Sequence, residues 1–199
     1  MYNENIKITA IASCGLNFEM GKDNDLVFRS KADMSFFKES TVGTLVVMGR
    51  KTYESIPAKL EDRTVAVLSS TGLVPNLHPN DVVIVPKSVG GLLRALKRIA
   101  SSRGYDRIVI AGGASVYELF APYVDEVYIT TFNKTDPDAD VFFPHEEYSN
   151  VALCEYRRVV LTPQDVFVRM FKKHNTAPDL AITDYFAKGK GQLPVTMPT

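Results

Sequence analysis

Tryptophan is absent from this sequence of 199 residues, and cysteine occurs only twice, as Cys14 and Cys154. Two cysteines are too few for a disulfide framework or for a zinc site of the usual spacing. The histidines stand in no motif that would activate a cysteine nucleophile. We therefore interpret them as surface or hydrogen-bonded side chains: His78, His145 and His174.

Net charge is also missing, because 23 basic side chains balance 23 acidic ones. A general nucleic-acid or membrane-surface binder needs a basic excess, so both classes are disfavoured. No segment is apolar for long enough to span a bilayer, and the first residues lack the basic start and apolar run of a signal peptide. We expect a soluble, cytoplasmic protein of a reducing compartment, with a monomer favoured.

Short β-branched runs alternate with helical patterns, which is typical of an α/β domain with a mostly parallel sheet. Strands are predicted within 6–13, 44–49, 64–70, 81–86, 106–110 and 125–132, and helices from Lys31, over 50–56, over 89–101 and before residue 120. In the helix over 89–101 the predicted buried face is Leu92, Leu93, Leu96 and Ile99. Two further runs, 151–160 and 165–173, predict an antiparallel hairpin at one sheet edge. We expect one domain over 1–175, followed by a tail, 176–199, that is poorly structured or packs on the domain or a neighbour.

Three predicted strand ends offer groups that suit phosphate. Open α/β sheets bind ligands beyond the carboxyl ends of their strands, where helix N-termini present backbone N–H groups. The first end is Gly49-Arg-Lys-Thr52, the second is Gly112-Gly-Ala-Ser115, and the third is Leu68-Ser-Ser-Thr71. Each glycine alone is equally well a turn residue, but three such ends together indicate a dinucleotide. The three-glycine dinucleotide fingerprint is absent, as are phosphate-loop, zinc-hydrolase and Ser-His-Asp patterns.

Asp33 lies among large apolar residues in the stretch "DLVFRSKADMSFFK". One interpretation is a capping box, in which the Ser30 hydroxyl accepts from the helix start and Asp33 faces the positive end of the dipole. The other is catalytic, because Asp33 shares a helix face with Phe36 and Phe37, where a carboxyl group is costly to ionise. The stretch alone does not decide between them.

Seven segments, in order and spacing, resemble dihydrofolate reductase over about residues 6 to 172: "IAS", "DLVFRSKADMSFFK", "VVMGRKTYESIP", "LEDRTVAVLSS", "VIAGGASVYELF", "VYIT" and "DVFFP". The resemblance implies a dihydrofolate-reductase-like α/β fold and the NADPH-dependent reduction of 7,8-dihydrofolate to 5,6,7,8-tetrahydrofolate, which supports one-carbon metabolism. It implies that Asp33 hydrogen-bonds the pterin N3 and 2-amino group and favours protonation at N5, and that Thr130 supports this carboxylate. Burial should raise the pKa of Asp33 above about 3.9.

The same resemblance implies the binding residues. Arg63 would bind the α-carboxylate of the substrate's glutamate tail, which suits its planar fork. The catalytic set is Asp33, Leu26, Phe28 and Thr130. The substrate set adds Ile11, Ala12, Met34, Phe37, Ser55, Ile56, Leu60, Ala111 and Tyr117. The cofactor set is Ser13, Met20, Gly21, Asn24, Gly49, Arg50, Lys51, Thr52, Leu68, Ser69, Ser70, Lys87, Gly112, Gly113, Ala114, Ser115, Val116 and Tyr117. Arg50, Ser69 and Ser70 would meet the 2′-phosphate, which favours NADPH over NADH.

The sequence departs from the family at two places. Leu26-Val27-Phe28 replaces the usual Leu/Met-Pro-Trp, so an indole N–H that helps to hold an active-site water is missing, and a proline that would fix φ is lost. Ala114-Ser115 stands where many relatives carry Gly and Arg, which removes a cation that Lys51 could replace. Two alternatives remain open: a related pyrimidine or pterin reductase, which would not need Arg63, and a non-catalytic folate- or NADPH-binding protein, which the Phe28 change motivates.

Overall fold

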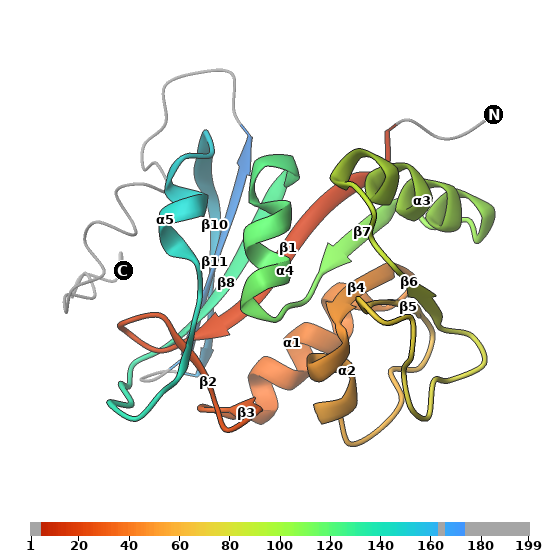
Figure 1. Cartoon of the computed structure of the whole chain (residues 1–199). Helices are drawn as coiled ribbons and strands as arrows, with labels where there is room; N and C mark the ends of the chain where they lie inside the picture. Colours follow the sequence, from red (N-terminus) through yellow and green to blue (C-terminus); the bar gives the residue numbers. More distant parts are fainter. Residues whose placement is uncertain (1–4, 163–165, 174–199) are drawn as a thin grey trace.

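The computed structural model describes residues 5–162 and 166–173 (Figure 1). Its main sheet has eight strands: β1 (Lys7–Cys14), β4 (Leu45–Gly49), β5 (Thr64–Leu68), β6 (Val82–Ile84), β7 (Arg107–Ile110), β8 (Glu126–Phe132), β10 (Leu153–Thr162) and β11 (Val166–Lys173). Their spatial order is β10-β11-β8-β1-β7-β4-β5-β6. The six strands from β8 to β6 are mutually parallel, whereas β11 runs antiparallel to both β8 and β10. The predicted parallel sheet with an antiparallel hairpin at one edge is confirmed.

Helices cover both faces of this sheet. They are α1 (Lys31–Thr41), α2 (Arg50–Ser55), α3 (Val89–Ser102), α4 (Ala114–Phe120) and α5 (His145–Ser149), with a short 3₁₀ turn, η1, at Ala121–Tyr123. One core cluster joins α3, α4 and α5 to alternate residues of β1 such as Ile8 and Ala10. On the other face α1 packs on Ile11 and Tyr128, and α2 packs on β4 and β5. This alternation is what a strand buried on both faces requires.

A second, three-stranded sheet was not predicted. It consists of β2 (Glu19–Lys22), β3 (Asp25–Leu26) and β9 (Val141–Phe142), in the order β3-β2-β9. No strand is predicted in these segments, because each strand is too short to show a repeating pattern. The sheet connects the segment after β1 to the segment after β8, which lies far along the chain (Figure 1).

Several predicted bounds are wrong by a few residues. β5 ends at Leu68 rather than at residue 70, and β6 is limited to Val82–Ile84. In α3 the fully buried residues are Leu92, Leu96 and Ala100, whereas Leu93 and Ile99 are only half-buried against the same core. The predicted tail, 176–199, lies outside the described residues.

Candidate active site

Asp33 lies in the first turn of α1, above the carboxyl ends of β1 and β8. The parallel register of these two strands places Ser13 directly beside Thr130, with Ile11 beside Tyr128 on the same face. The hydroxyl groups of Ser13 and Thr130 both donate hydrogen bonds to the Asp33 carboxylate. Phe36 and Phe37, one turn along α1, pack over Ile11 and Tyr128. The paired strands β1 and β8 therefore supply two hydrogen-bond donors to the one carboxyl group that α1 places over their ends.

Burial raises the pKa of Asp33 above its ordinary value. Only 8% of the residue is exposed. Desolvation is the largest cause, and the hydrogen bonds from Thr130 and Ser13, which lower the pKa, offset it only in part. The predicted direction of the pKa shift is confirmed.

Of the two interpretations of Asp33, the capping box does not form as described, although Asp33 does lie in the first turn of α1. Ser30 is the N-cap residue of α1 by position, with extended backbone, but its side chain makes no cap hydrogen bond. Asp33 turns toward the strand ends instead, where two hydroxyl donors satisfy its oxygens. A carboxyl group held there is not free to complete the reciprocal cap.

The two glycine-bounded helix starts touch each other. Gly49 and Gly113 are the N-cap residues of α2 and α4, and neither helix has a side-chain cap, so first-turn N–H groups remain available. The Gly49 N–H donates to the Gly112 carbonyl oxygen at 2.8 Å. A Cβ at Gly113 would lie 3.2 Å from the Thr52 hydroxyl oxygen. Gly112 has φ +100°, a conformation that side chains rarely adopt, and the Tyr117 ring lies directly against it.

Arg63, at the base of β5, is buried rather than solvated, with 5% exposed. Its Nε donates to the Glu61 carbonyl oxygen at 2.7 Å, and its Nη1 donates to the Thr41 hydroxyl at the end of α1. No carboxylate forms an ion pair with it in the part of the chain that the structure describes. Desolvation lowers the pKa of Arg63, and an anionic ligand would compensate this cost.

The other predicted residues fall into three groups by exposure. Buried ones are Ile11, Ala12, Met20, Leu68, Ser69, Gly112, Val116, Tyr117 and Thr130. Half-buried ones are Ser13, Gly21, Phe28, Phe37, Gly49, Arg50, Thr52, Ile56, Leu60, Ala111, Gly113 and Ala114. Exposed ones are Asn24, Leu26, Met34, Lys51, Ser55, Ser70, Lys87 and Ser115. A mixture of buried supports and exposed contact groups suits an open binding cleft.

Three of the predicted cofactor residues already have partners within the chain. Arg50 forms an ion pair with Glu54 at 2.8 Å, one turn along α2. The Ser69 hydroxyl lies 3.2 Å from both the Thr71 hydroxyl and the Leu73 carbonyl oxygen. The Tyr117 hydroxyl donates to the Ile11 carbonyl oxygen at 2.7 Å. Tyr117 thus links α4 to β1, and Ser69 holds the loop after β5.

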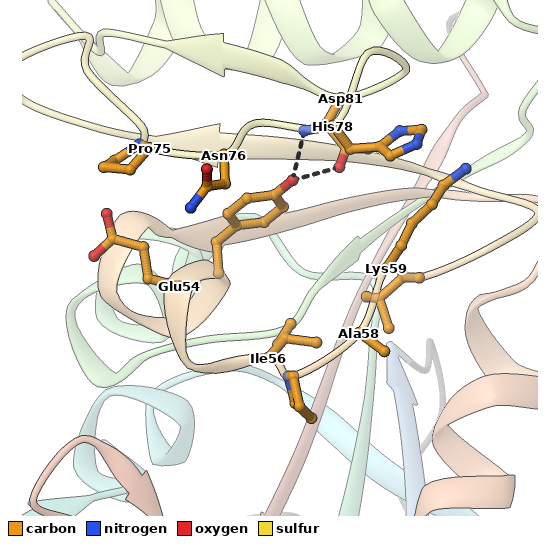
Figure 2. Close-up of a pocket in the computed structure, with 11 residues that line it drawn as sticks. Glu54, Ile56, Ala58, Lys59, Pro75, Asn76, His78 and Asp81 are labelled. Atoms are coloured by element: carbon orange, nitrogen blue, oxygen red, sulfur yellow. Dashed lines mark hydrogen bonds between the residues drawn. The ribbon is translucent and has the colours of Figure 1, made fainter.

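A cavity of about 390 Å³ lies beside α2, between the segments 53–60 and 75–81 (Figure 2). It shares Ile56 and Leu60 with the predicted substrate residues, whereas Asp33 does not line it. The Tyr53 hydroxyl donates to the Asp81 carboxylate at 2.8 Å (Figure 2). Asp81 also accepts from the Val65 N–H at 2.9 Å. This network ties α2 to β5 and so fixes the helix start at Gly49.

Some contacts of the site were not predicted from the sequence. Ser13 was assigned to the cofactor, but its hydroxyl bonds Asp33. Tyr53 and Asp81 were not singled out, because their contact spans 28 residues and no local pattern signals it. The predicted Thr130 is beside Asp33, as the "VYIT" segment implied.

The fold and the site together are those of a nucleotide-dependent reductase, with a buried carboxyl group at the ends of β1 and β8 and two helix starts that meet at Gly49 and Gly112. The family model for dihydrofolate reductase matches residues 7–171. The dihydrofolate reductase of Haemophilus influenzae is 34% identical over 151 residues, which is 74% of this chain and 86% of that protein. The dihydrofolate reductase of Bacillus subtilis is 30% identical over 173 residues, covering 85% of this chain and 96% of that protein. Dihydrofolate reductase from Enterococcus faecalis, complexed with NADP(H) and RAB-propyl, superposes with a TM-score of 0.69 at 25% identity, over 88% of this chain and 100% of that chain.

This chain belongs to the dihydrofolate reductase family. Family membership removes the alternative of a different reductase on the same fold. Within the described residues, no helix is long and apolar enough to cross a membrane.

Proposed function

We propose that Asp33 is the carboxyl group that orients the pterin ring and supports its protonation in the reduction of 7,8-dihydrofolate by NADPH. In that reaction a hydride is added to C6 and a proton to N5, which gives 5,6,7,8-tetrahydrofolate and NADP⁺. The observation that carries the proposal is a buried carboxyl group with a raised pKa at the end of β1. Burial moves the pKa of this carboxyl group upward from its ordinary value, in the direction that acid–base chemistry requires.

The surroundings of Asp33 suit this role. Ser13 and Thr130 fix the carboxyl oxygens by two hydrogen bonds, so the group presents one orientation to a ligand. Phe37, on the same face of α1, supplies apolar contact for an aromatic ring. In this arrangement Asp33 accepts from the pterin N3–H and 2-amino group, and a water carries the proton to N5.

Arg63 binds the α-carboxylate of the glutamate tail in this proposal. Arg63 bonds Thr41 at the last residue of α1, and Asp33 is eight residues earlier in the same helix (41 − 33). At roughly 1.5 Å per residue the two contacts are about 12 Å apart along the helix. An extended ligand with a ring at one end and a carboxylate at the other fits that spacing, whereas a tail-less pterin would leave Arg63 unused.

The paired starts of α2 and α4 fit the pyrophosphate of NADPH. Their first-turn N–H groups lack side-chain caps, and Gly49 and Gly113 leave the backbone open to close approach. Arg50 would exchange its exposed ion pair with Glu54 for the 2′-phosphate, with Ser70 as a hydroxyl donor. When bound, NADPH supplies the hydride, and the protein positions it, excludes water and manages the proton.

The test is a steady-state assay of purified protein with dihydrofolate and either NADPH or NADH, followed by the absorbance of the reduced nicotinamide. We expect oxidation of NADPH that depends on dihydrofolate. Asp33→Asn should lower turnover by about 10²-fold or more while NADPH affinity changes little. Tight NADPH and folate binding without turnover would support a non-catalytic protein, and unchanged turnover in Asp33→Asn would reject the role of Asp33.

We also propose that the protein is a cytoplasmic monomer with its domain in residues 1–175. Both cysteines are unpaired and buried, which suits a reducing compartment. The molar mass measured by light scattering tests the monomer, against 22.1 kDa for one chain.

A further inference from the structure

Glu19, in β2, is a buried carboxylate that the roles above leave unused. Only 2% of the residue is exposed, and it makes no ion pair among residues 5–162 and 166–173. A buried charge without a cation must be satisfied by hydrogen bonds. Its Oε2 accepts from the Asn17 N–H at 2.8 Å, and its Oε1 accepts from the Asn17 side-chain amide and the Asp136 N–H, each at 3.2 Å.

These hydrogen bonds join two segments that are distant in sequence. Glu19 belongs to the segment 15–28, which follows β1 and leads to α1, and Asp136 belongs to the loop 133–140, which follows β8. The same segments also meet through the Leu16 N–H and the Lys134 carbonyl oxygen at 2.9 Å. At the surface, Lys22 forms an ion pair with Asp138 at 3.1 Å. Of these links, the hydrogen bond from the Asp136 N–H to the Glu19 carboxylate is charge-assisted and has a buried acceptor. Charge-assisted hydrogen bonds are stronger than those between neutral groups.

Glu19 also contacts the residue against which Phe28 packs. A Cβ at Gly15 would lie 2.5 Å from the Glu19 Oε2 and 2.6 Å from the Phe28 Cε2, so both side chains lie directly on the Gly15 backbone. Phe28 in turn stacks on Phe132, with ring centroids 5.5 Å apart. Phe132 is two residues beyond Thr130 in β8. A shift of Glu19 would therefore free one side of the surface that holds the Phe28 ring.

We infer that Glu19 is a positioning residue of this reductase. Its carboxylate holds the segment 15–28 on the loop 133–140 and thereby sets Phe28 beside the Asp33 site. The inference rests on the proposed role of Asp33 and on the catalytic role that the family resemblance implies for Phe28. A purely structural role would stabilise the fold without changing the turnover of the folded enzyme.

The experiment compares Glu19→Ala and Glu19→Gln with Asp138→Asn. Gln keeps the size of Glu19, but its side-chain NH₂ replaces one carboxylate oxygen. That NH₂ group cannot accept the hydrogen bond that the oxygen accepted from an N–H donor. Asp138→Asn removes an acidic charge that joins the same two segments at the exposed surface, so it is the matched control. Turnover, the KM for dihydrofolate and the dissociation constant of NADPH are measured at a temperature well below the unfolding midpoint of each variant.

We expect Glu19→Ala to lower kcat about tenfold and Glu19→Gln to lower it about threefold, with NADPH affinity within about twofold of the parent. The deuterium isotope effect with NADPH labelled at the transferred position should rise, because a misplaced ring slows the hydride step. As a spectroscopic signature, Phe28→Trp introduces the only tryptophan of the chain, and adding Glu19→Ala should shift its emission to longer wavelength.

Two results would overturn the inference: a kcat for folded Glu19→Ala within about twofold of the parent, or an equal loss in Asp138→Asn. If Glu19→Ala does not fold, the Glu19→Gln variant is used instead, and an unchanged kcat in that variant would equally overturn the inference. Normal turnover in the Glu19 variants, together with a large loss in Asp33→Asn, would reject Glu19 and leave the proposed function standing.

Discussion

Asp33→Asn should make the protein more stable and nearly inactive at the same time. The Asp33 carboxylate loses more by desolvation than the Ser13 and Thr130 hydroxyl groups return, because its pKa is raised despite both bonds. A neutral Asn side chain avoids the charge, and it can keep both hydroxyl partners as acceptor and donor. We expect a gain on the order of 1 kcal/mol at pH 7, because the desolvation of the carboxylate costs more than two hydrogen bonds of roughly 1 kcal/mol each return. For a chain of this size the melting temperature should rise by about 2–4 °C.

The gain should depend on pH in a defined direction. An acid with a raised pKa in the folded state binds its proton more readily folded than unfolded, so wild-type stability falls as pH rises from about 3.9 through the folded pKa of Asp33. The Asn variant lacks this titration. The difference between the two proteins should therefore be absent below about pH 3.9 and fully developed above the folded pKa.

The assay is thermal unfolding of both proteins over a pH series, with turnover measured on the same samples. Taking the difference at each pH cancels the titration of the other carboxyl groups. Turnover of the variant should fall by about 10²- to 10⁴-fold, the usual contribution of a positioned acid–base group. A variant less stable than wild type at pH 7 would show that Asp33 is a stabilising structural charge, which contradicts the argument.

Three other side chains give further tests. Arg63→Gln should raise the KM for dihydrofolate about tenfold or more but leave a tail-less dihydropterin unaffected, and an equal effect on both substrates would refute its role. Arg50→Gln should reduce the preference for NADPH over NADH about tenfold, whereas equal losses with both cofactors would point to the pyrophosphate. Phe28→Trp should raise kcat by about two- to tenfold, because the indole N–H restores a donor for a bound water, and a lower kcat would show that the Gly15 surface accepts only the smaller ring.

The sheet could be predicted because its strands are strongly patterned. β4 and β5 are apolar runs that end at Gly49 and Leu68, and nearly every residue in them is buried. When apolar runs of this kind are separated by helical patterns, few sheet topologies other than a parallel one are compatible with the sequence. The short strands β2, β3 and β9 escaped prediction, because two to four residues show no period. In addition, β2 pairs with β9, whose residues lie more than a hundred positions further along the chain.

For the residues around Asp33, the sequence indicated which residues to name more readily than which of them touch one another. Asp33 and Thr130 were named from the segments that resemble the family, but the role of Ser13 depends on the register of β1 against β8, which no local pattern encodes. The choice between a cap and a catalyst at Asp33 was undecidable locally for the same reason. Both interpretations use the same spacing. The structure shows that Ser30 makes no cap hydrogen bond and that Ser13 and Thr130 bond Asp33, and the catalytic role of Asp33 stays a proposal.

The strands form the rigid part of the site, and the short helix α2 is its less constrained part. The strands β4, β5 and β7 are almost entirely buried, so the core fixes the ends of β4 at Gly49 and of β7 at Ile110, two residues before Gly112. The helix α2 that carries Arg50 and Thr52 has only six residues and no buried one, too short to be stable alone. Its position therefore depends on its packing against β4 and β5 and on the Tyr53 bond to Asp81. A ligand that bonds the N–H groups at the start of α2 would stabilise the folded protein by mass action, and under the proposed function that ligand is the cofactor.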